Sequence, residues 1–517
     1  MSLSVASILA ESALRRPDAR AVILGDTAVT YAELWESARR YAAVLRERGI
    51  GPADKVALLL PNVPDFPRTY YAVLALGGVV VPVHALLTAE DIAFLLTNSG
   101  AELLVCAGPL LGTGAKGAEL AGVPVLAVLD EGDATVERLD ALAADVAPID
   151  RLVDRDPGDD AVILYTSGTT GRPKGAVLSH LNLVLNASIA ATDVAHMTPA
   201  DVILGCLPLF HSFGQTCAMN AGFWAGSTLV LMPRFDGSAA LDLMMRQDVT
   251  IFHGVPTMYL GLLEAARTDG RRPALKVACS GGAALPVAAL EAFTEVFGVA
   301  ISEGYGLSET SPVATFNQEV YGRKPGTVGR PIWGVDVAIA KAEVEDRMEP
   351  LPVGEIGEVV IRGHNIMTRY HDNQEATAAA IVDGWFRSGD LGTLDADGFV
   401  TIVDRKKDMV LRGGFNVYPR EVEEVLIRHP AVAQVAVIPI PDERYGEEVC
   451  AVVLRDSSVA DRDDEELRSE LLAWGRDHLA GHKYPRRVDF VDALPLGPSG
   501  KVLKRELVAA YREQGNH

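Results

Sequence analysis

A loop at residues 165–180 holds the side chains best suited to binding phosphate. It reads YTSGTTGRPKGAVLSH and directly follows the apolar run AVILY. Glycines allow backbone N–H groups to close on an anion, and hydroxyls and a lysine add further donors. The Walker pattern GxxxxGK[ST] fits at no register, so this is a different phosphate loop. A helix is expected to begin near Ser179, a good capping residue. The predicted phosphate donors are Thr166, Ser167, Gly168, Thr169, Thr170 and Lys174.

Later segments add other reactive groups. GYGLSET contains Glu309, and a carboxylate is a hard oxygen ligand of the kind that Mg²⁺ prefers. PSGKVLKREL contains Lys501, although a lysine near the end of the sequence is usually solvated when taken alone. WFRSGDLG contains Asp390, although an aspartate in such a turn is usually structural when taken alone. PLFHSFG contains His211, and DRKKDMVLRGGFNVYPREVEE carries charged residues and a glycine pair.

These six motifs occur in the order found in the adenylate-forming superfamily, and the chain resembles that superfamily over nearly its whole length. The superfamily includes acyl-CoA synthetases, adenylation domains of peptide synthetases and firefly-type luciferases. The resemblance implies an ATP-dependent acid–CoA ligase. Such an enzyme converts a carboxylic acid to acyl-AMP with release of pyrophosphate, and then transfers the acyl group to coenzyme A. ATP, Mg²⁺ and coenzyme A are the implied cosubstrates and cofactor.

The resemblance also implies roles for individual residues. Tyr305 is expected to stack on adenine, Asp390 and Arg405 to contact the ribose, and Glu309 to hold the magnesium ion. Ser308 stands where threonine is more common in the family and retains the hydroxyl. Lys501, Glu309 and Thr166 are the implied catalytic residues. The implied nucleotide site comprises Thr166, Ser167, Gly168, Thr169, Thr170, Lys174, Gly281, Gly282, Ala283, Gly304, Tyr305, Gly306, Ser308, Asp390, Arg405 and Lys501.

The segments that would line the acyl pocket are apolar and aromatic. They suit a medium- or long-chain fatty acid, and an aryl acid such as a cinnamate is the alternative. FHSFG lacks the aspartate that amino-acid-activating relatives place there. Malonate-activating relatives place an arginine where this chain has Gly304, so a dicarboxylate is disfavoured and the glycine should leave space for an apolar tail. We interpret His253 and Trp333 as packing residues. The predicted lining residues are His211, Phe213, Met258, Leu307 and Pro312, with Phe210, Tyr259 and Val313 as further candidates.

The resemblance places a mobile part at the C-terminal end. Asp404 matches the hinge about which the small domain rotates, and Gly413 and Gly414 should then approach the pantetheine arm of coenzyme A. A fatty acyl-AMP ligase that loads a carrier protein is a rival, but no extra segment precedes DRKKD. A non-catalytic nucleotide-binding protein is disfavoured because Lys174, Glu309 and the other implied nucleotide contacts are all present. Lys504 and Arg505 are expected to be solvated.

The elements that must position these groups have an α/β pattern. Continuous apolar runs such as KVALLLP and STLVLMP predict strands buried on both faces, with helices above and below them. Residues 32–48 have helical spacing, and YYAVLALGGVVVPVHALL is predicted to be a buried helix followed by a strand. After about Val359, shorter strands are expected. With the resemblance, the predicted fold is a large N-terminal domain of doubly wound sheets with a small barrel-like subdomain, residues 1–403, and a small mobile α+β domain, residues 404–517.

The bulk composition excludes several other classes. The chain has 517 residues with 47 basic and 69 acidic side chains, a formal net charge of -22. This charge argues against a broad nucleic-acid surface or a polybasic membrane anchor. The N-terminus is predicted to be the first helix and not a signal peptide, and the five cysteines form no CxxC pair, so a cytoplasmic location is expected. The expected partners are small molecules, with no nucleic acid and no integral membrane segment; a homodimer is left open.

Overall fold

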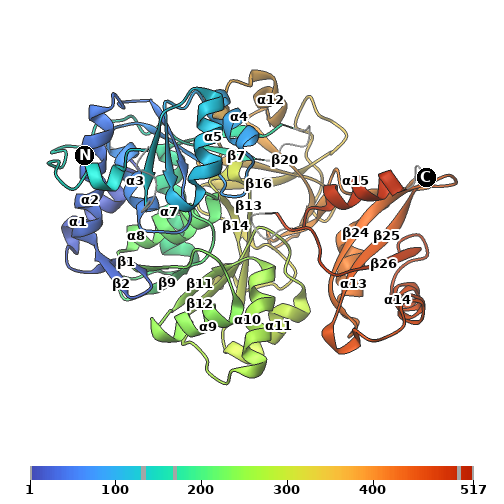
Figure 1. Cartoon of the computed structure of the whole chain (residues 1–517). Coiled ribbons are helices and arrows are strands. Elements are labelled where there is room, and N and C mark those ends of the chain that lie inside the picture. Colours follow the sequence, from blue (N-terminus) through green and yellow to red (C-terminus); the bar gives the residue numbers. More distant parts are fainter. Residues whose placement is uncertain (1–2, 130–135, 167–171, 498–501, 515–517) are drawn as a thin grey trace.

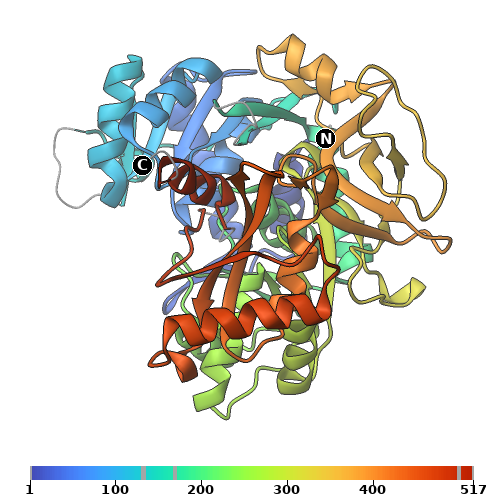
Figure 2. The same cartoon turned by 90° about the vertical axis from the view of Figure 1, so that its right-hand side faces the viewer.

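The computed structural model of the chain describes residues 3–129, 136–166, 172–497 and 502–514. Three sheets and their helices form a large N-terminal part, and a small C-terminal domain follows strand β21 (Val400–Arg405). Figure 1 shows the small domain beside the large part, and Figure 2 shows it in front. The proposed boundary between residues 403 and 404 falls near the end of β21.

The first large sheet has nine strands in the order β15-β14-β13-β12-β11-β9-β10-β1-β2. Its central strands, from β13 to β1, are parallel, and both edges are antiparallel. Among them, β9, β10 and β11 are buried along their whole length, as the continuous apolar runs predicted. The bounds of all nine strands are β1 Arg20–Leu24, β2 Thr27–Thr30, β9 Val202–Gly205, β10 Thr228–Leu231, β11 Ile251–Gly254, β12 Val277–Ser280, β13 Ile301–Gly306, β14 Val313–Phe316 and β15 Arg330–Pro331.

The second large sheet has seven strands in the order β18-β8-β7-β4-β3-β5-β6. Strands β7, β4, β3, β5 and β6 are parallel, whereas β8 and β18 add an antiparallel edge. This edge carries the phosphate loop described below. The bounds are β3 Lys55–Leu59, β4 Val79–Pro82, β5 Leu103–Ala107, β6 Val125–Val128, β7 Asp160–Thr166, β8 Lys174–Ser179 and β18 Arg369–Tyr370.

The helices of the large part confirm three local predictions. Helix α1 is the predicted first helix, α2 matches the amphipathic segment 32–48, and α3 followed by β4 matches the predicted buried helix and strand. None of the helices in the described ranges combines the length and apolar character needed to cross a membrane. The bounds are α1 Ala6–Arg15, α2 Tyr31–Glu47, α3 Asp65–Ala75, α4 Ala89–Ser99, α5 Leu111–Ala121, α6 Leu139–Leu142, α7 His180–Ile189, α8 Ala221–Ala225, α9 Gly237–Arg246, α10 Pro256–Thr268, α11 Val287–Phe297 and α12 Gln374–Ala380.

A smaller antiparallel sheet completes the large part, in agreement with the predicted extra subdomain. Its strands have the order β16-β17-β20-β19, and β21 pairs with β20. Strand β20 carries WFRSGDLG, and β21 leads into the C-terminal domain. The bounds are β16 Val335–Ala340, β17 Gly357–Gly363, β19 Ile381–Val382 and β20 Trp385–Leu394.

The C-terminal domain is α+β, as predicted. However, the expectation of shorter strands is wrong, because β24 and β25 have 11 and 10 residues. This hairpin can be long because both of its faces are covered: one apolar cluster includes residues of α13 and α14, and another includes residues of α15. The bounds are β22 Val410–Arg412, β23 Phe415–Val417, β24 Val432–Asp442, β25 Gly446–Arg455, β26 Arg487–Val491, α13 Pro419–Leu426, α14 Asp464–His478 and α15 Lys504–Gln514.

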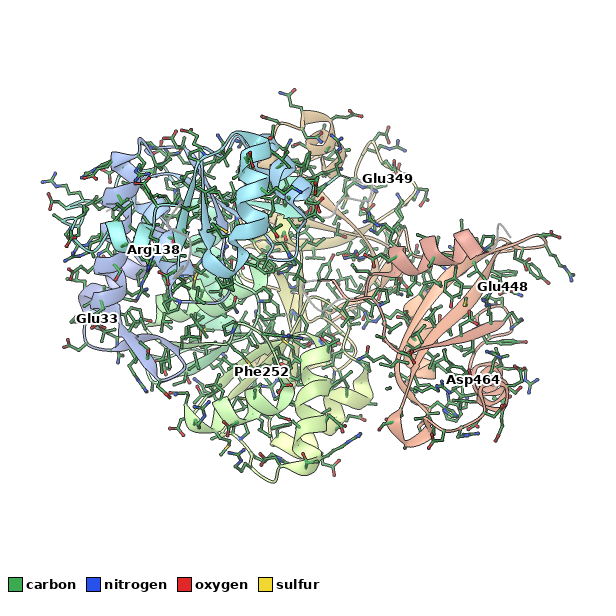
Figure 3. All side chains as sticks on the ribbon, in the orientation of Figure 1. Glu33, Arg138, Phe252, Glu349, Glu448 and Asp464 are labelled. Carbon is green, nitrogen blue, oxygen red and sulfur yellow. The ribbon has the colours of Figure 1, made fainter. Side chains whose placement is uncertain are left out.

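The two faces of the nine-stranded sheet have separate cores. Phe252 of β11, labelled in Figure 3, is fully buried and its ring lies 4.9 Å from that of Tyr259 on α10. Met244 on α9 belongs to the same cluster. Because neighbouring residues of a strand point to opposite faces, the next residue, His253, faces away from this core.

Candidate nucleotide and acyl site

The phosphate loop is the tip of a β-hairpin. Strands β7 and β8 pair antiparallel, with Thr166 opposite Lys174. Helix α7 begins only after β8, and the Ser179 hydroxyl accepts a hydrogen bond from the Asn182 backbone N–H at 3.2 Å, which confirms the predicted helix start. Strand β8 was not predicted from the sequence, which indicated a loop over these residues. The predicted donors Ser167, Gly168, Thr169 and Thr170 lie outside the described residues.

A polar network joins the two ends of this loop to GYGLSET. The Thr166 hydroxyl donates to Glu309 Oε1 at 3.1 Å, and the Tyr370 hydroxyl donates to the same oxygen at 3.0 Å. Lys174 Nζ lies 5.4 Å from the centre of the Tyr370 ring. Glu309 is buried in the described structure, so its carboxylate is held in place by these two donors.

Tyr370 is a member of this network that sequence reasoning missed. It lies in no recognised motif and enters through strand β18, which pairs with β8. Burial and the neighbouring Glu309 carboxylate raise the pKa of its hydroxyl well above the usual range. The hydroxyl therefore stays protonated and remains a donor at neutral pH. The contact of Tyr370 with Glu309 could have been predicted only from the pairing of β18 with β8.

A second cluster brings together the three predicted adenosine contacts. The Tyr305 hydroxyl donates to Asp390 Oδ2 at 2.7 Å, and Arg405 Nε lies 3.5 Å from Asp390 Oδ1. Asp390 and Arg405 stand opposite each other on β20 and β21. The turn before Asp390 is fixed because Glu358 Oε1 accepts the Gly389 backbone N–H at 3.0 Å. These three side chains therefore form one preorganised group.

Close backbone packing explains one glycine of GYGLSET. A Cβ on Gly306 would stand 1.7 Å from the Pro312 carbonyl oxygen, so no side chain fits there. Ser308 Oγ lies 3.5 Å from Ser212 Oγ, which places PLFHSFG against GYGLSET. Both motifs are thus parts of one site.

The predicted purine wall, Gly281, Gly282 and Ala283, follows β12 at its carboxyl end. Gly282 has φ 84°, a conformation that favours glycine. The loop ends at Leu285, whose backbone N–H donates to Glu303 Oε1 at 3.4 Å. Burial raises the pKa of Glu303 to about 7. Glu303 therefore links the wall to strand β13, on which Tyr305 also lies.

The predicted acyl residues come from several elements. Phe213 lies on a π-helix, η3 (Phe213–Asn220), and packs against a cluster that includes Met258 and another that borders Val313. A Cβ on Gly281 would lie 3.2 Å from the Phe213 ring, which puts this ring beside the purine wall. His211 Nδ1 accepts the Phe213 backbone N–H at 3.3 Å. Leu307 and Val313 are half-buried, and Pro312 is buried.

Two expectations about this region are wrong. Gly304 does not leave open space on its side-chain side, because a Cβ there would stand 2.8 Å from the ring of Phe316. Trp333 is not a packing residue, since it is 67% exposed. Both errors concern what lies opposite a residue in space, which the local sequence does not specify.

The predicted hinge residue, Asp404, has hydrogen bonds to β21 and to α13. Asp404 Oδ1 accepts the Arg405 backbone N–H at 2.7 Å, and Asp404 Oδ2 accepts the Arg420 backbone N–H at 2.9 Å. The Arg420 guanidinium also donates to the Ile402 carbonyl oxygen at 2.6 Å. Helix α13 of the small domain is thereby fastened to the end of β21.

Lys504 is not solvated, contrary to expectation. Its Nζ lies 2.7 Å from Glu423 Oε1, and the two side chains are only 20% and 21% exposed. The reason is that α15 packs on the β24–β25 hairpin and brings Lys504 against α13. Arg505 is exposed, as expected. Lys501 lies outside the described residues.

Gly413 and Gly414 form the two-residue turn between β22 and β23. Their φ angles are 57° and 85°, and a turn with two positive φ angles is the type that favours glycine at both positions. Gly413 N–H donates to the Tyr445 carbonyl at 2.9 Å, and both glycines are exposed. The hairpin turn therefore explains why both residues are glycine. Their contact with coenzyme A stays a prediction.

Comparison with known proteins identifies relatives over both domains. The family described as AMP-binding enzyme matches residues 9–371, and the AMP-binding enzyme C-terminal domain matches residues 421–501. A feruloyl-CoA synthase from Amycolatopsis sp is 40% identical over 498 residues, which covers 95% of this chain and 96% of the relative. A long-chain-fatty-acid–CoA ligase from Bacillus subtilis is 34% identical over 542 residues, which covers 99% and 95%.

A solved structure agrees in fold and in domain arrangement. ATP-bound MatB from Rhodopseudomonas palustris is 34% identical and has a TM-score of 0.90, covering 99% of this chain and 100% of that chain. The apo structure of the same protein, at 33% identity and the same coverage, has a TM-score of 0.78. The arrangement of the whole chain is therefore closer to the ATP-bound form.

Proposed function

We propose that this chain activates a monocarboxylic acid with an uncharged tail, foremost a medium- or long-chain fatty acid. The chain belongs to the AMP-binding enzyme family and is an acid–CoA ligase of the AMP-forming type. The two family matches and the relatives over nearly the full length confirm the family predicted from the motifs. The observation that carries the choice of acid is the lining around Phe213.

Apolar side chains and the lack of a cation at position 304 support an uncharged tail. Phe213, Met258 and Val313 border the candidate acyl site. Gly304, where malonate-activating relatives place an arginine, is covered by the ring of Phe316. A second carboxylate buried against these groups would lack a partner, which costs several kcal/mol. A dicarboxylate is therefore a poor candidate.

An aryl acid is the second candidate. The 40% identical relative is named a feruloyl-CoA synthase. The Phe213 and His253 rings, with centres 6.0 Å apart, offer edges and faces for packing against a planar ring. A flat aryl acid and a flexible fatty acid would occupy the same site. Rates measured on a panel of acids therefore distinguish these two candidate substrates.

In the first half-reaction, an oxygen of the acid's carboxylate attacks the α-phosphorus of ATP and pyrophosphate leaves. The Thr166 hydroxyl and Lys174 would hold phosphates, while Tyr305, Asp390 and Arg405 would hold adenosine. Glu309 and the adjacent Thr166 hydroxyl are hard oxygen donors that fit Mg²⁺, which when bound would neutralise phosphate charge. We assign Lys501 to stabilisation of the α-phosphate, and one such preorganised group contributes roughly 3–4 kcal/mol.

In the second half-reaction, the thiolate of coenzyme A attacks the adenylate's carbonyl carbon and AMP leaves. Rotation of the small domain about Asp404 would withdraw Lys501 and bring the Gly413–Gly414 turn to the site. The similarity to ATP-bound MatB supports assigning the present arrangement to the first half-reaction. We infer that this rotation breaks the hydrogen bond between the Asp404 carboxylate and the Arg420 backbone N–H.

The test is release of AMP and pyrophosphate with ATP and magnesium, with and without coenzyme A. The panel runs from acetate to palmitate and includes malonate, benzoate and coumarate. Turnover that depends on coenzyme A and peaks on a fatty acid is expected. A peak on an aryl acid would favour the second candidate, and pyrophosphate exchange without acyl-CoA would indicate transfer to a carrier protein. A cytoplasmic location stays a prediction that cell fractionation can test. A homodimer stays a prediction that light scattering can test.

A further inference from the structure

A buried histidine beside the candidate acyl site has no hydrogen-bond partner. His253 of β11 is 2% exposed, and neither Nδ1 nor Nε2 has a partner among the residues that the structure describes. Buried polar atoms are nearly always paired because an unpaired one loses its hydration without compensation. A histidine with two such atoms is therefore suited to pairing with a polar group of a bound ligand.

The position of His253 places its side chain near the candidate acyl site. Phe252 faces the cluster under α9 and α10, so His253 points to the other face of the sheet. There its ring centre lies 6.0 Å from that of Phe213, in an edge-on arrangement. Phe213 in turn lies against Gly281, the first residue of the purine wall. The unpaired imidazole thus adjoins the wall of the acyl site.

The helix that carries Phe213 supplies further unpaired groups. Thr216 Oγ1 and Gln215 Oε1 lie on η3, both residues are fully buried, and neither atom has a partner within the described ranges. A π-helix often marks a functional site, because it departs from the regular backbone ladder. These unpaired polar groups therefore lie on two neighbouring elements, β11 and η3.

The chemistry of the imidazole limits what it can bind. Burial lowers the pKa of His253 to about 4, so the ring is neutral at pH 7. A neutral imidazole offers one N–H donor and one bare nitrogen acceptor. It can pair with a ketone, hydroxyl or methoxy oxygen, but it cannot neutralise a second carboxylate.

We propose that His253 is a specificity-determining residue and that the preferred acid carries an uncharged oxygen substituent, a ketone or hydroxyl, on its tail. The inference rests on the proposed function and narrows the class of its substrate. A plain hydrocarbon tail would leave the imidazole unpaired, whereas an oxygen substituent at the matching depth would satisfy it. The enzyme would discriminate against a plain acid because that substrate leaves the buried His253 imidazole without a hydrogen-bond partner.

The test compares kcat/KM for octanoate with that for 4-, 5-, 6- and 7-oxo-octanoate and the corresponding hydroxy acids, together with cinnamate and 4-hydroxycinnamate. The wild-type enzyme should prefer at least one oxygenated acid over its plain counterpart by roughly tenfold, the worth of one hydrogen bond. His253→Leu should remove most of this preference and raise kcat/KM for the plain acid. His253→Asn should preserve part of the preference, because its amide both donates and accepts.

His196→Asn is the matched control. His196 is exposed and has φ 44°, a conformation that asparagine accommodates, so the preference should not change. Thermal unfolding and ATP–pyrophosphate exchange with the best plain acid verify that each variant is folded. Equal wild-type rates on plain and oxygenated acids, or an unchanged preference in His253→Leu, would overturn the inference. Absence of turnover with every acid would instead count against the proposed function.

Discussion

The carboxylate of Asp404 accepts the backbone N–H of Arg420 at 2.9 Å. Asp404 is the penultimate residue of β21, the last strand of the large part, and Arg420 lies in the first turn of α13. The hinge side chain therefore caps a helix of the domain that is proposed to rotate about it. Burial raises the pKa of Asp404, which reflects its enclosed position between the domains. We propose that this cap holds the present domain arrangement and opens when the small domain rotates.

Removal of this cap should affect the two half-reactions differently. In Asp404→Ala, the α13 N–H group and the hinge lose their connection, so acyl-AMP formation should fall by roughly tenfold. Thioester formation from synthetic acyl-AMP should not fall. Asp404→Asn retains an acceptor oxygen, so its rate of acyl-AMP formation should lie between those of the wild type and Asp404→Ala. Pyrophosphate exchange and single-turnover acyl transfer measure these rates, and an equal loss in both half-reactions would contradict the role of the cap.

Lys501→Ala should separate the half-reactions more sharply. Loss of the assigned cation should reduce acyl-AMP formation by roughly 100-fold or more, as for one preorganised oxyanion donor. Transfer from synthetic acyl-AMP to coenzyme A should be retained. Arg505→Ala, an exposed neighbour, is the control and should change neither step. The assignment fails if both steps decline together in Lys501→Ala.

The ion pair of Lys504 and Glu423 should stabilise the C-terminal domain. Lys504→Met would leave the mostly buried Glu423 carboxylate without its charge partner, at a cost of about 3 kcal/mol. A second change, Glu423→Gln, should recover part of the loss because the amide oxygen can still accept the Val437 N–H. Lys406→Met is the control, since its partner Glu345 is 76% exposed. Calorimetry would show equal melting temperatures for Lys504→Met and Lys406→Met if the pair is unimportant.

Glu309 should determine the magnesium dependence of adenylation. Glu309→Gln keeps the side-chain shape but removes the charge, and we expect a loss of roughly 100-fold at limiting magnesium. Tyr370→Phe removes one of the two donors that orient Glu309 and should have a smaller effect in the same direction. Pyrophosphate exchange titrated with magnesium checks both variants. An unshifted magnesium midpoint in Glu309→Gln would exclude the assigned role.

Glu303 should make stability depend on pH near neutrality. Burial raises its pKa from 4.5 to about 7, so the folded state binds this proton more tightly than the unfolded state. Its stabilising contribution is complete below pH 4.5 and is lost as the pH rises through 7. Glu303→Gln lacks this titration, so its stability relative to wild type should improve by about 3 kcal/mol between pH 4 and pH 8.

The measurement is chemical denaturation of wild type and Glu303→Gln across that pH range. Glu319→Gln, with an exposed carboxylate, serves as the control and should track the wild type. Parallel pH curves for wild type and Glu303→Gln would show that Glu303 does not titrate differently in the folded state.

Local patterns were sufficient for most elements. Continuous apolar runs predicted the parallel strands, because a strand covered on both faces has no polar side. Ser179 predicted the start of α7, because a hydroxyl at that position can accept the free N–H groups of the first helical turn. Strand β8 was missed because GAVLS has no distinctive pattern and forms a strand only by pairing with β7.

The sequence by itself determined the family and the α/β class, and it predicted a set of nucleotide contacts, because each motif carries its chemistry within a few positions. The tertiary structure decided which distant side chains meet. It brought Tyr370 to Glu309, covered Gly304 with Phe316 and buried Lys504 against α13. It also left His253, beside Phe213, without a hydrogen-bond partner among the described residues. Contacts of this kind depend on strand pairing and on which face of a sheet a helix covers, and neither is encoded in the spacing of nearby residues.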